Sequence, residues 1–257
     1  MTYLNIYRNS TKSLLAFAIF FFIIHLYSQE TKLNGVNGRL FVSGGKLSLE
    51  VQSSRPLAKA ADLLERRFGV PISYEDPEYI LSDDLEDLAS NNQTEAQGKQ
   101  KKWLAPRATH LTATVDNFDI TKTPDKQPLE SSVENFTKTL IERDILTPGR
   151  RILQVGPISS GLLIRPQKNS TSIQETALDR VISMENKERS LFSFIEELCK
   201  TITIQQGTPI EVGNIPLDFL RLKVKMGAER EIARDLLLRS LNTLNYRTSW
   251  RLALPAF

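Results

Sequence analysis

The spacing of apolar and polar residues predicts helices and strands that alternate along the chain. Residues 56–68 carry apolar side chains at helical spacing, with Ser53 or Ser54 placed to cap the helix. Gly69 follows directly and suits the left-handed end of a helix. Residues 70–74 then resume as a strand, so this stretch forms a helix–strand unit.

A first module is expected over residues 38–166. The polar stretch at residues 82–102, with acids first and lysines last, interrupts it and is typical of a solvated surface loop. Its other expected elements are strands at residues 40–42, 46–52, 111–115, 151–155 and 161–164 and a helix at residues 129–144. The resulting order is β-α-β, insertion, β-α-β-β.

A second module is expected over residues 178–257, after a polar linker at residues 167–177. Its expected elements are strands at residues 178–184, 209–212, 220–225 and 246–254 and helices at residues 191–202 and 233–244. The segment Gly69-Val70-Pro71-Ile72 is echoed by Gly207-Thr208-Pro209-Ile210, which together with the element order predicts an internal duplication. The expected fold class is therefore α/β of the α+β type: two small two-layer modules of β-α-β-β-α-β order, with helices packed on one face of a mixed sheet.

The first residues have the pattern of an export signal. Arg8 and Lys12 precede an unbroken apolar run at residues 14–24, and Ser28 follows as a small residue at a possible cleavage point. The run is shorter than the roughly 20 residues that a spanning helix needs. Residues 1–28 are therefore expected to be a signal peptide, or an N-terminal anchor if they are not cleaved. Either way the remainder is expected to be extracytoplasmic, periplasmic or secreted, and anchored to the inner membrane only by an uncleaved leader.

Composition and charge narrow the classes of partner. The 257 residues are 40% hydrophobic and 25% charged, which is ordinary for a globular protein. The formal net charge is +3, and Arg8 and Lys12 supply two of these charges, so the exported remainder has no electrostatic footprint for nucleic acid. The single cysteine, Cys199, lies in an apolar helical pattern and is expected to be a small buried side chain.

The candidate chemistry is sparse. Once the leader is set aside, His110 is the only histidine, and it has no zinc-ligand spacing with Cys199 and no Gly-x-Ser-x-Gly nucleophile motif to serve. No catalytic residue, metal or cofactor is therefore expected. Two alternatives remain open: a cell-wall or glycan hydrolase that uses Glu75, Asp76 or neighbouring acids, and a glycan-binding module that stacks sugars. The stacking candidates are Tyr74, Tyr79 and Trp103.

A family resemblance rests on two runs of residues. They are Arg55-Pro56-Leu57-Ala58, followed by Ala60-Ala61 and Leu63-Leu64, and then Phe68-Gly69-Val70-Pro71-Ile72-Ser73-Tyr74. The pattern resembles the short N-terminal domain of secretins and TonB-dependent receptors, and the run at residues 53–80 also looks like a group of uncharacterised exported bacterial proteins. The resemblance implies a small two-layer extracytoplasmic domain used for protein contacts. It covers residues 47–76 well and residues 181–254 only by element order, and a transport-channel role is not carried over from it.

These observations predict an exported, non-enzymatic module for protein interaction or envelope assembly. Its expected partners are envelope proteins, with no nucleic acid, and the sequence defines neither the ligand nor the oligomeric state. The candidate partner surface combines a strand end with a basic strand face, in which cations alternate with apolar residues. Its residues are Tyr74, Glu75 and Asp76, and Arg221, Lys223 and Lys225.

Overall fold

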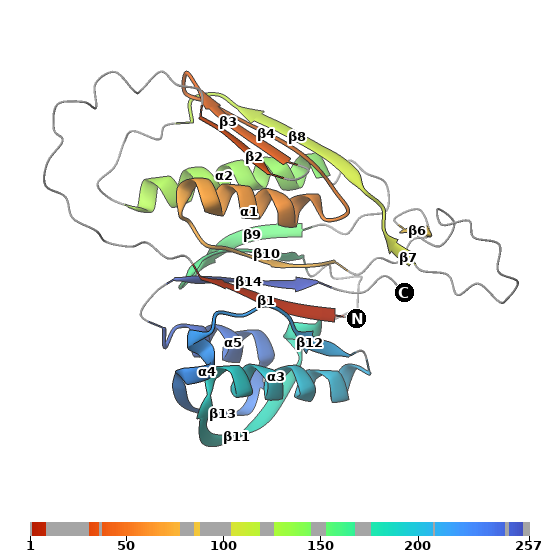
Figure 1. The fold of residues 1–257 in the computed structure, drawn as a ribbon, viewed down its shortest axis with the longest axis vertical. Helices are drawn as coiled ribbons and strands as arrows, with labels where there is room; N and C mark the ends of the chain where they lie inside the picture. Colours follow the sequence, from red (N-terminus) through yellow and green to blue (C-terminus); the bar gives the residue numbers. More distant parts are fainter. Residues whose placement is uncertain are drawn as a thin grey trace, which may run out of the picture. The chain divides into compact units, whose positions relative to one another are not determined.

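The computed structural model places the chain in two compact units. It describes residues 2–8, 31–35, 38–77, 85–87, 104–118, 126–144, 153–167, 176–207, 209–244 and 247–253. Unit 1 comprises Met1–Asn9, Pro71–Arg107 and Pro148–Phe257, and unit 2 comprises Ser10–Val70 and Ala108–Thr147. The elements of both units are labelled in Figure 1.

Unit 2 is a two-layer α+β domain. Its four-stranded antiparallel sheet has the order β2-β3-β4-β8, and helices α1 and α2 pack on one face of this sheet (Figure 1). The elements are β2 (Thr31–Gly35), β3 (Gly38–Ser43), β4 (Lys46–Ser53), α1 (Pro56–Phe68), β8 (Thr109–Val115) and α2 (Lys126–Asp144). Leu47, Leu49 and Val51 of β4 are buried, whereas Glu50 and Gln52 between and beyond them are exposed, which confirms the half-buried strand.

Helix α1 begins and ends where the sequence predicts, but its N-cap residue differs from the predicted one. Pro56 is its first residue, where the missing N–H removes no helical hydrogen bond, but the N-cap position belongs to Arg55 rather than to a serine. The hydroxyl of Ser53 instead accepts a hydrogen bond from the Arg55 backbone N–H at 3.1 Å. Gly69 ends the helix at φ 68°, the left-handed conformation that glycine adopts without a steric penalty.

Unit 1 is built on a six-stranded mixed sheet with the order β12-β1-β14-β5-β10-β9. Its strands are β1 (Thr2–Arg8), β5 (Ile72–Glu75), β9 (Leu153–Ile158), β10 (Gly161–Pro166), β12 (Ile210–Val212) and β14 (Thr248–Ala253). Strands β9 and β10 form the predicted hairpin, whereas β5 pairs in parallel with both β10 and β14. The sheet therefore joins segments from the start, the middle and the end of the chain.

Helices and a long two-stranded ribbon complete unit 1. The ribbon pairs β11 (Val181–Ser190) with β13 (Lys223–Ile232), and a short separate pair joins β6 (Leu85–Asp87) to β7 (Leu104–Pro106). The helical elements are η3 (Ala177–Asp179), α3 (Leu191–Gln206), α4 (Asp218–Arg221) and α5 (Ala233–Leu241). The apolar stripes of α3 and α5 meet the ribbon and β14 in one core, in which Phe194, Phe219 and Trp250 are fully buried.

The predicted fold class is confirmed, since the chain is a mixed α/β protein of the α+β type. The element order is also close to the expected one. Three local expectations are wrong: residues 178–184 begin as a 3₁₀ turn, residues 218–221 form α4 before β13 begins, and α2 begins at Lys126, three residues early. The strand pairing moreover crosses the expected boundary between the modules, because β5, β9 and β10 share a sheet with β14.

Strand β1 lies within the range expected for the leader. Residues 2–8 are paired on both sides, with β14 and with β12, whereas the apolar run at residues 14–24 lies outside the described residues. Among the residues that the structure describes, no helix is both long enough and apolar enough to cross a membrane.

Candidate functional site

A buried ion-pair cluster lies at the centre of unit 1. Glu75 on β5 is completely inaccessible to solvent, and both of its oxygens accept hydrogen bonds from Arg234 on α5, at 2.5 and 2.7 Å. The remaining guanidinium nitrogen of Arg234 donates to Asp179 in η3 at 2.5 Å, and Thr176 accepts a further bond at 2.9 Å. A single arginine thus joins a central strand, a helix and the segment that follows the linker.

The charges of this cluster are strongly coupled. Burial raises the pKa of Glu75 above its ordinary value, while the hydrogen bonds from Arg234 and its charge oppose this rise. Desolvation alone would lower the pKa of Arg234, but the hydrogen bonds and charge of Glu75, and then those of Asp179, raise it overall. The guanidinium of Arg234 therefore remains charged, and the cluster stabilises the fold only while the acids and the arginine stay together.

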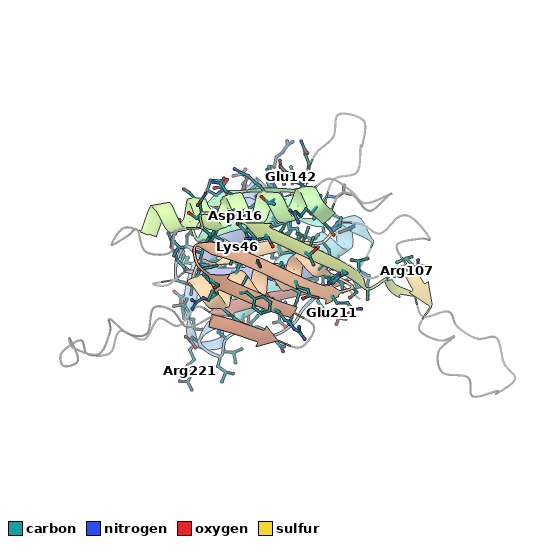
Figure 2. All side chains as sticks on the ribbon, turned by 90° about the horizontal axis from the view of Figure 1, so that it is seen from above. Lys46, Arg107, Asp116, Glu142, Glu211 and Arg221 are labelled. Carbon is teal, nitrogen blue, oxygen red and sulfur yellow. The ribbon has the colours of Figure 1, made fainter. Side chains whose placement is uncertain are left out.

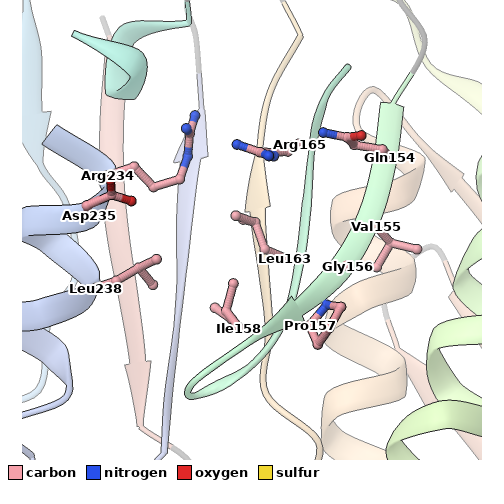
Figure 3. Close-up of a pocket in the computed structure, with 10 residues that line it drawn as sticks. All are labelled: Gln154, Val155, Gly156, Pro157, Ile158, Leu163, Arg165, Arg234, Asp235 and Leu238. Atoms are coloured by element: carbon pink, nitrogen blue, oxygen red, sulfur yellow. The ribbon is translucent and has the colours of Figure 1, made fainter. Parts of the chain in front are cut away.

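A pocket of about 300 Å³ lies beside this cluster, between α5 and the β9–β10 hairpin. Figure 3 shows Arg234 and Arg165 toward one end of it and the apolar side chains of Leu163 and Leu238 further along. Gly156 contributes only backbone to the wall, and a Cβ at this position would meet no atom within 4 Å. The open space at Gly156 therefore comes from the missing side chain, not from a constraint on the backbone.

An exposed patch of mixed character lies on α4 and β13. We define the α4–β13 patch as Leu217, Leu220, Arg221, Lys223 and Lys225. Leu217 and Leu220 are 78% and 49% exposed, and the three cations are all exposed. In Figure 2 Arg221 projects away from the ribbon. The patch thus presents aliphatic and cationic groups together on neighbouring residues.

Some of the site residues predicted from the sequence are exposed, and the others are buried. Lys223 and Lys225 are exposed and alternate with the buried Val224 and Met226, as expected for a basic strand face. Tyr74, Glu75 and Asp76 are 3%, 0% and 2% exposed, so the expectation of an exposed strand end is wrong. Arg234 of α5 and Thr176 cover the Glu75 side chain, and β5 itself lies between β10 and β14 and not at an edge of the sheet.

The residues weighed for chemistry belong to different units. His110 and Glu50 form an exposed pair at 3.1 Å on the sheet of unit 2, whereas Cys199 is buried in the core of unit 1. Tyr79 and Trp103, the other two stacking candidates, lie outside the described residues. Within the part of the chain that the structure describes, no group of His, Cys, Asp and Glu is arranged to hold a metal ion.

Cys199 is expected to be unreactive in the folded protein. Burial, with a smaller contribution from the charge of Glu196, raises the pKa of its thiol to about 12, so almost no thiolate forms near neutral pH. A thiol reagent such as DTNB should therefore label Cys199 only after denaturant unfolds the chain. Rapid labelling of the native protein at pH 7.5 would contradict this burial.

The comparisons with known proteins found no relative of this chain. No family model, no curated protein and no solved structure matches the chain. The resemblance to the short N-terminal domain of secretins and TonB-dependent receptors therefore stays a prediction from the sequence.

The sequence pattern indicated Glu75 as a site residue but did not indicate the side chains that form the cluster with it. Arg234 is 159 positions away from Glu75, and Asp179 follows a polar linker that suggested no site. Gly156 and Arg165 line the pocket, but Gly156 lies in the turn of the expected hairpin, Arg165 directly follows its second strand, and neither belongs to a motif. The only usable sign was an arginine in the first turn of α5, where an acid suits the helix dipole better than a cation.

Proposed function

We propose that this chain is an exported, non-enzymatic module that binds a partner protein of the cell envelope through the α4–β13 patch. The observation that supports the proposal is the exposure of Leu217 and Leu220 beside Arg221, Lys223 and Lys225. The export signal expected in residues 1–28 supports a partner outside the cytoplasm.

The chemistry of the patch defines the kind of partner. Exposed aliphatic side chains gain free energy when a partner covers them, by about 25 cal/mol for each Å² of apolar surface removed from water. Arginine and lysine beside them favour a partner that carries carboxylates, and such complementary charges speed association and fix the register. The partner surface is therefore apolar and acidic. Lys225 lies opposite Glu188 in the ribbon, so the patch is not the uniformly basic surface that nucleic acid requires.

The geometry gives the hydrolase alternative less support. Glycoside hydrolysis needs one carboxyl group free to protonate the leaving group and a second carboxyl group across the bond. Glu75 is completely buried and bonded to Arg234 through both oxygens, and Asp76, the next residue, is also buried. Neither carboxyl group is free to meet a polysaccharide.

The test uses two matched pairs of variants. Leu217→Asp with Leu220→Gln should lower the yield of a photo-crosslinked partner from envelope extracts at least tenfold, because the apolar contact is lost. Leu217 and Leu220 are both exposed, so polar side chains at these positions should leave the fold intact. Ile204→Asp is the control, since Ile204 is 74% exposed but lies on α3.

The charge arm follows the same design. Arg221→Glu with Lys223→Glu should weaken capture and remove its dependence on salt, whereas Lys200→Glu, an exposed cation on α3, should change neither. Equal capture by the patch variants and by their controls would overturn the proposed binding surface.

A further inference from the structure

Strand β1 fills a position in the middle of the unit 1 sheet. It runs antiparallel to β14, from Tyr3 opposite Ala253 to Arg8 opposite Thr248. On its other side it runs parallel to β12, from Thr2 opposite Ile210 to Leu4 opposite Val212. We call the place between β14 and β12 the β1 position.

The strand that borders the β1 position is deeply buried. Trp250 and Leu252 of β14 are 0% and 1% exposed, and the register pairs them with Ile6 and Leu4. An aromatic side chain as large as tryptophan removes about 150–250 Å² of surface from water when it is buried. Without a strand at the β1 position, β14 would present an unpaired backbone edge next to these residues.

Strand β14 carries buried polar side-chain atoms. Within the described part of the chain, the indole nitrogen of Trp250 and the hydroxyl of Thr248 are buried without a hydrogen-bond partner. Buried polar groups of this kind are rare, because each unmade hydrogen bond costs about 1–3 kcal/mol. These atoms belong to side chains of β14 and are separate from the backbone ladder that β14 forms with β1.

Export and the β1 position are mutually exclusive for residues 2–8. In a signal sequence the basic flank, here Arg8 and Lys12, stays on the cytoplasmic side while the following chain is translocated. Residues 2–8 and 248–253 would then lie on opposite sides of the membrane. This separation holds whether the leader is cleaved after residue 28 or is retained as an anchor.

We propose that in the exported chain the β1 position is filled by an extended segment of a partner protein, so that β14 and β12 form a strand-accepting site. The inference rests on the proposed export but not on the α4–β13 patch. Strand addition gives affinity through main-chain hydrogen bonds, and side-chain pockets at alternate positions give specificity. Strand β1 is the template for what fits: an extended segment, antiparallel to β14, with aliphatic residues at the positions of Leu4 and Ile6.

The test uses the exported chain, recovered from the envelope fraction of cells that express the full sequence. Trp103→Phe leaves Trp250 as the only tryptophan, because the chain contains two. The probe is a synthetic peptide with the sequence of residues 2–8, titrated while Trp250 emission and amide hydrogen exchange of residues 248–253 are followed. We expect saturable binding with one peptide per chain and at least tenfold slower exchange of the β14 amides in the complex.

A peptide with Leu4→Pro is the matched control. Leu4 is paired on both sides, so proline removes a donor that the ladder needs, and binding should weaken at least tenfold. If the exported chain is largely unfolded alone, the unmodified peptide should restore protection in α3 and α5 as well, and failure to restore it would overturn the proposal.

The remaining outcomes separate this inference from the proposed function. A cytoplasmic chain that retains residues 2–8 paired with β14 would refute export and the strand-accepting site together. An exported chain whose β14 amides are already protected without peptide, as a monomer, would overturn the strand-accepting site alone. Protection that appears only in a dimer would assign the β1 position to a second copy and overturn the partner strand. The variants at Leu217, Leu220, Arg221 and Lys223 test the α4–β13 patch independently of the strand-accepting site.

Discussion

Replacing Arg234 by methionine is expected to lower the free energy of unfolding by about 3–5 kcal/mol, because it leaves Glu75 and Asp179 buried without their counter-charge. Urea denaturation followed by far-UV circular dichroism measures the change. Arg239→Met is the control: Arg239 lies on the same helix and also bonds a glutamate, Glu231, but this pair is exposed and its loss should cost about 0–1 kcal/mol. Equal losses in the two variants would contradict the role assigned to the buried cluster.

The same variant should respond to pH in a defined direction. Arg234 is the main influence that lowers the pKa of Glu75, so its removal raises that pKa further above the ordinary value of 4.5. A carboxyl group with a raised pKa in the folded state stabilises the protein below its unfolded pKa, and this contribution is lost as the pH rises through the folded pKa. The deficit of Arg234→Met relative to wild type should therefore shrink toward pH 4.5 and grow above it.

A double variant tests whether Glu75 and Arg234 depend on each other for their effect on stability. In Arg234→Met the buried carboxylate of Glu75 has lost its arginine partner. Adding Glu75→Gln removes this unpaired charge, so the double variant should be more stable than Arg234→Met alone. A double variant that loses the sum of both single effects would show that the two residues act independently, contrary to the bonds between them.

The second large effect is expected at Gly161, at the start of β10. A Cβ at this position would overlap the carbonyl oxygen of Pro71, which accepts the 2.9 Å hydrogen bond from Leu162 N–H that begins the β5–β10 pairing. The backbone there is also at φ 152°, where side chains are rare. Gly161→Ala should therefore lower the free energy of unfolding by about 3 kcal/mol. Thermal and urea unfolding provide the measurement.

Gly156→Ala is the control in the same hairpin. Gly156 has no positive φ, and an added Cβ would meet nothing within 4 Å, so this substitution should change stability by only a few tenths of a kcal/mol. If the two alanine variants unfold at the same denaturant concentration, the close approach of β10 to Pro71 is not what restricts Gly161.

Local elements were predictable from the sequence because local rules determine them. The apolar stripe and Gly69 define α1, the stripe of α3 ends at Gly207, and Ser159-Ser160 closes the β9–β10 hairpin. The two glycines of the echoed segments, Gly69 and Gly207, both have positive φ and both precede strands of the six-stranded sheet. The internal duplication suggested by this echo remains a prediction.

The pairing of distant strands could not be derived in the same way. The alternation in β14 predicts a half-buried strand, yet Ser249 and Arg251 are buried as well as Trp250, so both faces of this strand are covered. Periodicity records one buried face and does not identify a strand's neighbours. The same limit applies to the buried cluster: an acid at the end of a strand is usually solvated, and only the tertiary fold brings Arg234 to Glu75.

The placement of β14 between β1 and β5 also determines when the sheet can close. The hydrogen bond from Trp250 N–H to Ser73 Oγ spans 177 positions, so the nascent chain must be almost complete before β5 acquires β14 as its second neighbour beside β10. Contacts of such long sequence separation make folding slow. During synthesis unit 1 therefore completes its six-stranded sheet only after β14, near the end of the chain, has left the ribosome.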